Sequence, residues 1–189
     1  MGRGKSPLGG SLNERQVVTL ESASEDWFEY EKANLMSQYI RTGKMPDEYI
    51  DGTKVSDKEK RMLMAEAELM QAEASKTNTG QKTLYRGMVM SEPDARALSP
   101  GQTYTTRTLT ATTPDKRMST TYADVENYGG GSGVSVIMTF QKPDGMRGVK
   151  RDSMETVMPK GAKFKIVRNY MDKDGVVHID LYAKKGKNT

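Results

Sequence analysis

The spacing of apolar residues divides the chain into a helical first half and a strand-rich second half. Up to residues 78–80, apolar side chains return every three or four positions, as they do on one face of an α-helix. From residue 83 onwards they alternate with polar residues or form short apolar runs, as in β-strands. We therefore predict an α+β fold in which a helical N-terminal half packs on a mostly antiparallel β-sheet core.

Two helices are predicted in the first half. The stretch Ser22-Ala23-Ser24-Glu25 has the form of a capping box, in which the serine and glutamate side chains satisfy free backbone N–H groups. A second capping box begins at Ser56, and the two helices end at Gly43 and at Asn78-Thr79-Gly80. Their apolar faces are predicted to hold Phe28, Leu35, Met36, Tyr39 and Ile40 in the first helix and Leu63, Ala67, Met70 and Ala74 in the second.

The second half is predicted to consist mainly of strands. We expect strands at residues 83–90, 103–110 and 134–140, with a loop and a short helix over 114–128. The last two strands form the clearest hairpin, because Asp172-Lys173-Asp174-Gly175 separates two runs of alternating apolar residues.

The length of 189 residues favours one domain, which we place at residues 12–183 between a flexible basic leader (1–11) and a basic tail (184–189). Charged residues make up 29% of the chain and hydrophobic residues 35%. No apolar run approaches the ~18 residues of a membrane span, so we expect no membrane partner.

Two residue counts restrict the chemistry. The chain has no cysteine, which excludes disulfides, thiolate catalysis and cysteine-bound zinc. A single histidine, His178, excludes a histidine cluster for metal and argues against a Ser-His-Asp triad. Catalysis would therefore depend on carboxylates, hydroxyls, arginine or lysine.

The net charge of +4 is unevenly distributed. Residues 12–75 carry eight basic and fourteen acidic side chains, whereas residues 141–168 carry eight basic and three acidic ones. The basic segment suits an anionic ligand, such as a phosphate-containing cofactor or a nucleic acid. Alternatively, the uneven charge has no functional meaning and follows only from which residues helices and strands carry on their surfaces.

Three short motifs carry candidate chemistry. The first is Leu84-Tyr85-Arg86-Gly87, in which a guanidinium can pair bidentately with phosphate and the glycine lets its backbone approach a flat ring closely. The second is Leu109-Thr110-Ala111-Thr112, whose hydroxyls at alternate positions point to one face of a strand. The third places Glu155 before a short apolar run that ends at Pro159-Lys160-Gly161.

In this order, the motifs resemble those of the mono-ADP-ribosyltransferases, a family of bacterial toxins and phage-encoded transferases. The resemblance covers residues 25–183 and concerns the subgroup with an arginine, a Ser-Thr-Ser strand and a catalytic glutamate. The middle hydroxyl is missing at Ala111, and the register could instead be set at Thr112-Thr113 or Ser119-Thr120. Ser153 stands where the family has a glutamate or glutamine two residues before the catalytic glutamate.

The resemblance implies an NAD-dependent enzyme that needs no metal. Glu155 would be catalytic, and Ser153 would occupy the position that helps to select the acceptor. Binding of NAD would involve Arg86 at the pyrophosphate and Gly87, Thr110, Thr112 and Tyr122 around the nicotinamide end, with Thr110 orienting Glu155.

The acceptor is left open by the sequence. Serine cannot act as a general base at neutral pH, so Ser153 disfavours an arginine acceptor and leaves another side chain, a nucleic acid or water. A pure NAD glycohydrolase and a non-catalytic NAD- or nucleic-acid-binding module are the alternatives. Without an apolar secretory core near its start, the chain is expected in the cytoplasm (that of the host if it is phage-encoded) or in a virion.

Overall fold

The computed structural model describes residues 18–183, which form two compact units that divide between Glu73 and Ala74. The predicted leader, residues 1–11, and the predicted tail, residues 184–189, lie outside the described residues. The division falls inside helix α3, and the single domain over 12–183 stays a prediction. Among the described residues, no helix combines the length and the apolar character needed to cross a membrane.

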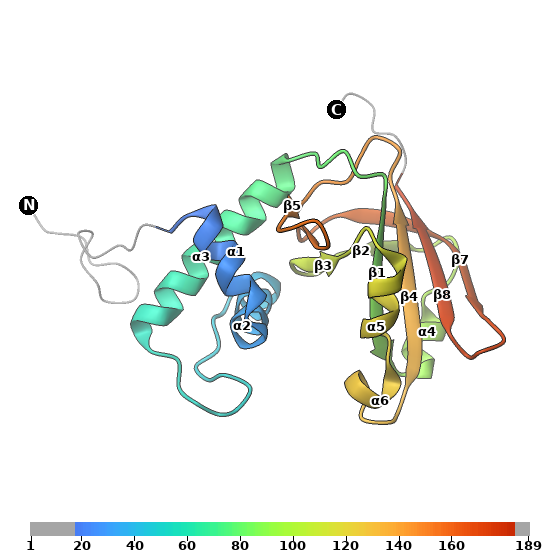
Figure 1. Cartoon of the computed structure of the whole chain (residues 1–189), viewed down its shortest axis with the longest axis horizontal. Coiled ribbons are helices and arrows are strands. Elements are labelled where there is room, and N and C mark those ends of the chain that lie inside the picture. Colours follow the sequence, from blue (N-terminus) through green and yellow to red (C-terminus); the bar gives the residue numbers. More distant parts are fainter. Residues whose placement is uncertain (1–17, 184–189) are drawn as a thin grey trace, which may run out of the picture. The chain divides into compact units, whose positions relative to one another are not determined.

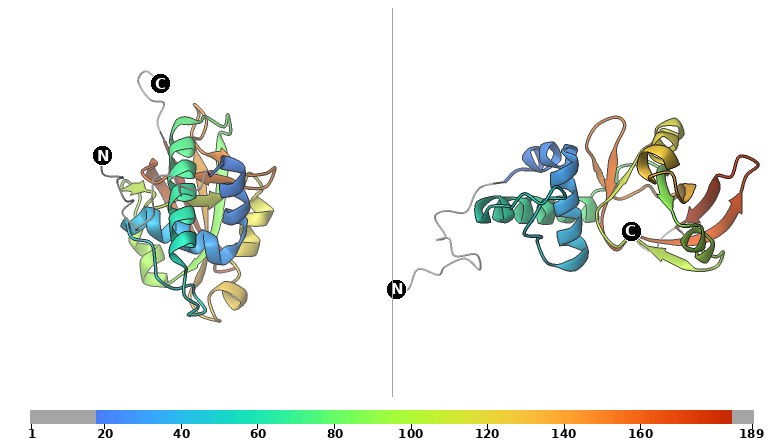
Figure 2. Two further views of the ribbon diagram at one scale, coloured as in Figure 1. Left: turned by 90° about the vertical axis from the view of Figure 1, so that its left-hand side faces the viewer. Right: turned by 90° about the horizontal axis from the view of Figure 1, so that it is seen from below.

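The first unit is built from helices (Figures 1 and 2). They are α1 (Leu20–Phe28), α2 (Tyr30–Thr42) and α3 (Asp57–Lys76). The Ser56 hydroxyl accepts a hydrogen bond from the Glu59 backbone N–H, which confirms the cap of α3. Gly43 ends α2 in the left-handed conformation, as predicted, with a φ of 78°. The predicted stripe of α3, which consists of Leu63, Ala67, Met70 and Ala74, is fully buried.

The predicted first helix is in fact two helices. Thr19, rather than Ser22, is the N-cap of α1, and Ser22 returns the bond as the third residue of the helix. The backbone is extended at Glu29, where α1 ends and α2 begins. This break changes the direction of the apolar face, so Trp27 is buried while Phe28, which we expected in the core, is 73% exposed.

A buried acid connects the three helices of this unit. Glu66 of α3 is only 1% exposed, and its side chain is hydrogen-bonded to Asp26 of α1, which also accepts a bond from Lys32 of α2 at 3.0 Å. Within the described residues, the Oε2 atom of Glu66 has no hydrogen-bond partner. Burial, followed by the hydrogen bond and negative charge of Asp26, raises the pKa of Glu66 to about 8. Glu66 is therefore protonated at neutral pH.

The described part of the second unit, up to residue 183, contains two sheets and three short helices. The larger sheet has the order β1-β4-β8-β7-β2 and the smaller one the order β3-β6-β5. All strand pairs are antiparallel except β4 and β8, so the mostly antiparallel α+β architecture is confirmed. The elements are β1 (Thr83–Met90), α4 (Glu92–Ala97), β2 (Thr103–Thr105), β3 (Thr110–Thr112), α5 (Lys116–Tyr122), α6 (Val125–Tyr128), β4 (Val134–Gln141), β5 (Val149–Lys150), β6 (Thr156–Met158), β7 (Lys163–Met171) and β8 (Val177–Tyr182).

The core of the second unit lies on one face of the large sheet. Phe140 of β4 and Phe164 of β7 meet edge to face, with their ring centroids 4.9 Å apart. The predicted alternation in the last hairpin is confirmed, because Val177, Ile179 and Leu181 are buried while their neighbours are partly exposed. The predicted strand over 103–110 is instead two short strands, β2 and β3, which belong to different sheets.

Candidate active site

Arg86 lies in the middle of β1 and points toward the smaller sheet. Its Nη1 atom donates a hydrogen bond to the carbonyl oxygen of Ala111 on β3, at 2.8 Å. Burial lowers the pKa of Arg86, but a guanidinium remains charged in a protein. Among residues 18–183, Arg86 forms no ion pair with a carboxylate. A half-buried cation whose partner is a neutral carbonyl is well suited to bind an anionic ligand.

The threonines of β3 use their hydroxyls within the sheet. The Thr110 hydroxyl donates to the carbonyl of Thr108 at 2.9 Å, and the Thr112 hydroxyl donates to the carbonyl of Thr156 on β6 at 2.7 Å. Both threonines are buried. In the part of the chain that the structure describes, neither side chain forms a hydrogen bond with Glu155. Thr112 therefore holds β3 against β6, beside the candidate catalytic residue.

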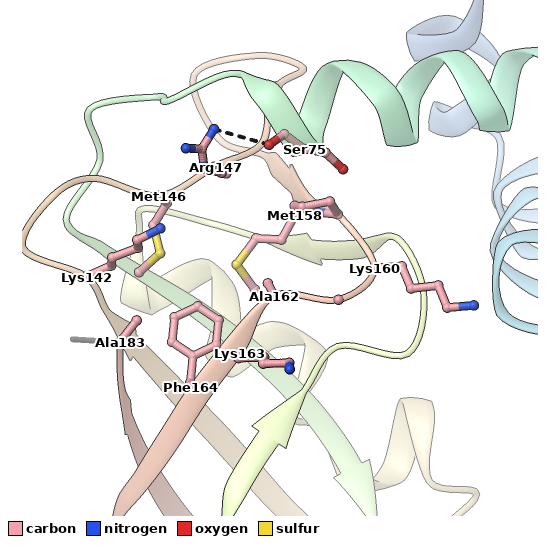
Figure 3. A pocket seen from close by; sticks show the side chains of 12 residues that line it. Ser75, Lys142, Met146, Arg147, Met158, Lys160, Ala162, Lys163, Phe164 and Ala183 are labelled. Carbon is pink, nitrogen blue, oxygen red and sulfur yellow. Dashed lines mark hydrogen bonds between the residues drawn. The ribbon is translucent and has the colours of Figure 1, made fainter. Parts of the chain in front are cut away.

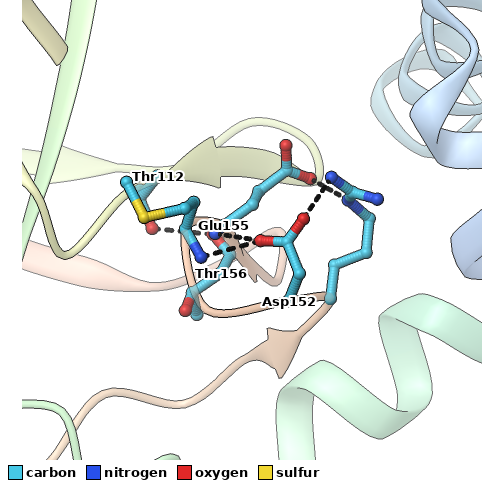
Figure 4. Close-up of polar contacts among 6 residues, drawn as sticks. Thr112, Asp152, Glu155 and Thr156 are labelled. Atoms are coloured by element: carbon cyan, nitrogen blue, oxygen red, sulfur yellow. Dashed lines mark hydrogen bonds and ion pairs between the residues drawn. The ribbon is translucent and has the colours of Figure 1, made fainter. Parts of the chain in front are cut away.

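Glu155 closes a tight turn between β5 and β6 (Figure 4). The Arg151 N–H donates to the Glu155 carbonyl at 3.0 Å, and the Asp152 Oδ1 atom accepts from the backbone N–H groups of Met154 and Glu155, both at 2.8 Å. An aspartate that binds the backbone two and three residues ahead fixes such a turn locally. The position of Glu155 is thus determined by the carboxylate of Asp152.

One carboxylate oxygen of Glu155 is paired and the other is available. The Oε1 atom lies 3.1 Å from Nε of Arg151, whose Nη2 atom lies 2.7 Å from Oδ2 of Asp152. The Glu155 side chain is 25% exposed, and its Oε2 atom forms no hydrogen bond among the described residues. Arg151 therefore orients the carboxylate and leaves one oxygen free to accept a bond from a ligand.

The sequence did not point to Arg151 or Asp152 as parts of the site. The backbone turns at Asp152, and its carboxylate binds the backbone N–H of Glu155. The signal was present, since Asp152 precedes Ser153 and Met154, and aspartate favours this kind of turn. Ser153 lies exposed in the turn, and no carboxylate substitutes for the missing glutamate at this position.

Helix α5 packs directly on β1 at Gly87 (Figure 1). A Cβ atom at Gly87 would lie 1.6 Å from the carbonyl oxygen of Ser119, so no larger residue fits. The close packing of α5 therefore requires glycine at position 87. Because α5 fills the space where a side chain would lie, a ligand cannot approach Gly87 from that side. Tyr122, at the end of α5, is 47% exposed and contacts Tyr128, with ring centroids 5.8 Å apart.

Backbone contacts connect the three sequence motifs. Tyr85 and Thr113 exchange two backbone hydrogen bonds, of 2.8 and 2.9 Å, which join β1 to the end of β3. β3 in turn pairs with β6, with Ala111 opposite Val157. Arg86, on β1 of the larger sheet, and Glu155, just before β6 of the smaller sheet, are therefore connected through β3. A cation and a carboxylate are thus held on adjoining segments of the second unit.

Solved structures with a similar fold are ADP-ribosyltransferases. The Vis toxin of Vibrio splendidus superposes with a TM-score of 0.61 at 16% identity, over 92% of this chain and 77% of Vis. The Salmonella SpvB domain gives 0.56 at 14% identity, over 89% of this chain and all of the domain. C3larvin of Paenibacillus larvae gives 0.52 at 15% identity, over 92% and 99%.

These similarities establish the fold. The chain has the α+β fold of the mono-ADP-ribosyltransferase toxins, as the resemblance of its motifs implied. No protein-family model and no curated protein matches the sequence.

Proposed function

We propose that this chain is an NAD-dependent mono-ADP-ribosyltransferase, which cleaves the bond between nicotinamide and ribose and transfers ADP-ribose to an acceptor. The observation that carries the proposal is the link from Arg86 through Ala111 to the strand that begins after Glu155. This link combines a cation for the pyrophosphate with a carboxylate for the ribose. The shared fold supports the same conclusion, and the toxin ExoS has been solved with carba-NAD.

Glu155 has the geometry to stabilise the transition state. When the nicotinamide bond breaks, its electron pair leaves with nicotinamide and positive charge develops on the ribose. A carboxylate held by Arg151 at one oxygen can bind the ribose 2′-hydroxyl with the other and stabilise that charge. Arg86 would hold the pyrophosphate, so that binding energy from the distant part of NAD positions the reacting bond.

Tyr122 and the threonines have different proposed roles. The exposed ring of Tyr122 would pack near the nicotinamide. Thr110 and Thr112 would act indirectly, because their hydroxyls hold the backbone of β3 and its pairing with β6. The proposed orientation of Glu155 then comes from Arg151 and Asp152.

The acceptor is proposed to be something other than arginine. Deprotonating an arginine acceptor needs a second base near Glu155, but position 153 is a serine. The oxygens of Asp152 are already engaged, Oδ1 by two backbone N–H groups and Oδ2 by Arg151. Vis has been solved with agmatine, a guanidine compound, which makes agmatine a useful probe of this difference.

The direct test is nicotinamide release from NAD. Substituting Glu155→Gln should lower the rate at least about 100-fold, because it removes the charge that stabilises the transition state. Glu92→Gln is the matched control, since Glu92 is a surface residue paired with Arg96 on α4. Equal, negligible release by wild type and Glu155→Gln with protein, nucleic-acid and small-molecule acceptors would refute the proposal.

A non-catalytic binding module is the second candidate. The pairing of Glu155 with Arg151, together with Ala111 in place of a hydroxyl, favours it. NAD binding without nicotinamide release would support this candidate. A pure glycohydrolase would release nicotinamide but label no macromolecule, which mass spectrometry of a lysate incubated with an NAD analogue would detect.

A further inference from the structure

A second concave site lies where β6 ends, whereas Glu155 precedes the start of that strand. Figure 3 shows the side chains that line this site. This basic cavity has a volume of about 340 Å³, within the size range of small-ligand pockets. Its twelve lining residues include four cations and no carboxylate. The lining consists of Ser75, Lys142, Met146, Arg147, Met158, Pro159, Lys160, Gly161, Ala162, Lys163, Phe164 and Ala183.

The cations of the basic cavity come from separate segments that converge there. Lys142 follows β4, Arg147 precedes β5, Lys160 lies in the turn before β7, and Lys163 is the first residue of β7. Arg147 donates to the carbonyl of Ser75, a neutral partner, at 3.2 Å, and it forms no ion pair within the described part of the chain. The side chains of Lys142 and Lys163 form no hydrogen bond or ion pair within residues 18–183. A concave surface of one charge sign attracts a phosphate.

The floor of the basic cavity is apolar. Met146, Met158 and Phe164 line it, and each is at most 4% exposed (Figure 3). Because these side chains are almost fully buried, the floor offers a narrow apolar contact to a base and no broad stacking platform. Cations around an apolar floor match the two parts of a nucleotide, which are a charged phosphate and a planar base.

One wall of the basic cavity is held rigidly by Thr106. Its hydroxyl donates to the Pro159 carbonyl at 2.7 Å and accepts from the Ala162 N–H at 2.9 Å. Backbone bonds join Thr106 to Gly161 and Ala162 as well. A wall that is ordered before binding reduces the entropy lost when a ligand binds.

We propose that the basic cavity binds one nucleotide of a single-stranded nucleic acid and presents the neighbouring nucleotides to Glu155. Three residues of β6 separate Glu155 from the cavity wall, which corresponds to roughly 10 Å, or the span of a few nucleotides. The cavity admits an unstacked base, which a single strand offers and a duplex does not. This inference rests on the proposed function only for the transfer step, because binding of the single-stranded nucleic acid is measured independently.

The test is fluorescence anisotropy with a labelled single-stranded oligonucleotide at several salt concentrations. Reversing the charge in Lys142→Glu/Lys163→Glu should weaken binding at least about 10-fold and reduce the salt slope by about 1.4, since each phosphate contact contributes about 0.7. The control, Lys116→Glu/Lys173→Glu, changes the net charge equally at two exposed positions outside the cavity and should retain the wild-type slope.

Other outcomes separate the alternatives. Absent binding, or equal losses in both double variants, would overturn the inference, as would tighter binding of duplex or of AMP alone. A higher KM for NAD in Lys142→Glu/Lys163→Glu, with unchanged oligonucleotide binding, would assign the cavity to NAD instead. Failure of nicotinamide release in the wild type refutes the proposed function but does not affect the oligonucleotide-binding result.

Discussion

The buried acid Glu66 predicts a stability that depends on pH. Its pKa in the folded chain is about 8, against about 4.3 in an unfolded chain. Because the folded value is higher, its contribution to stability is complete below about pH 4.3 and is lost as the pH rises toward about 8. The slope at intermediate pH reaches about 1.4 kcal/mol per pH unit, so the loss between about pH 5 and about pH 8 is on the order of 4 kcal/mol.

The substitution Glu66→Gln tests this reasoning. Glutamine has the same shape and stays neutral, and its amide can still donate a hydrogen bond to Asp26. Urea denaturation followed by far-UV circular dichroism should show similar stabilities near pH 5. Near pH 8, the variant should be more stable by on the order of 2–4 kcal/mol.

A matched control separates Glu66 from the general effect of charge. Glu21→Gln removes a carboxylate from the exposed first turn of α1 and should retain the pH profile of the wild type. If the curves of Glu66→Gln and wild type run parallel between about pH 5 and pH 8, Glu66 is ionised in the folded protein and the explanation is wrong.

Three further predictions concern the second unit. Gly87→Ala should lower the free energy of unfolding, measured by urea denaturation, by at least about 1–3 kcal/mol, because the new Cβ would overlap the backbone of α5. The control Gly175→Ala should lower it by only about 1 kcal/mol, because Gly175 has a φ of 80° but open space around it. Thr106→Val should lower the free energy of unfolding by about 1–3 kcal/mol, because the Pro159 carbonyl loses its hydrogen-bond donor and the Ala162 N–H loses its acceptor. Asp152→Ala should lower kcat for nicotinamide release about 10- to 100-fold with little change in KM for NAD. Asp152→Asn should keep much of the rate, because its amide oxygen can still accept the backbone hydrogen bonds of the turn. Equal rates in the wild type and both variants would contradict the positioning role of Asp152.

Elements with a strong periodic pattern were predictable from the sequence. The stripe of α3 and the hairpin of β7 and β8 followed from spacing alone, because burial of one face determines both. The start of α1 was not predictable in this way. Thr19 and Ser22 are both good caps, and the choice between them depends on which side chain, Trp27 or Phe28, reaches the core.

The candidate site, like the fold, was predictable only in part. The sequence motifs indicated Arg86 and Glu155, and the structure positions both on adjoining segments. The partners of their polar groups were not predictable, because they depend on strand register and turn geometry. A carbonyl of Ala111 and a guanidinium of Arg151 carry no signal in a motif until the backbone brings them within 3.1 Å.

The parallel pairing of β4 with β8 has a consequence for how such a chain can change. The turn that bears Glu155 and the strands on either side of it lie in the connection between β4 and β7, outside the five-stranded sheet. Doubling the length of a flexible loop costs only about 0.6 kcal/mol, so the exposed residues Ser153 and Met154 can be exchanged or extended while that sheet keeps its register. Under the proposed function, a change of acceptor preference would therefore need no change to the large sheet.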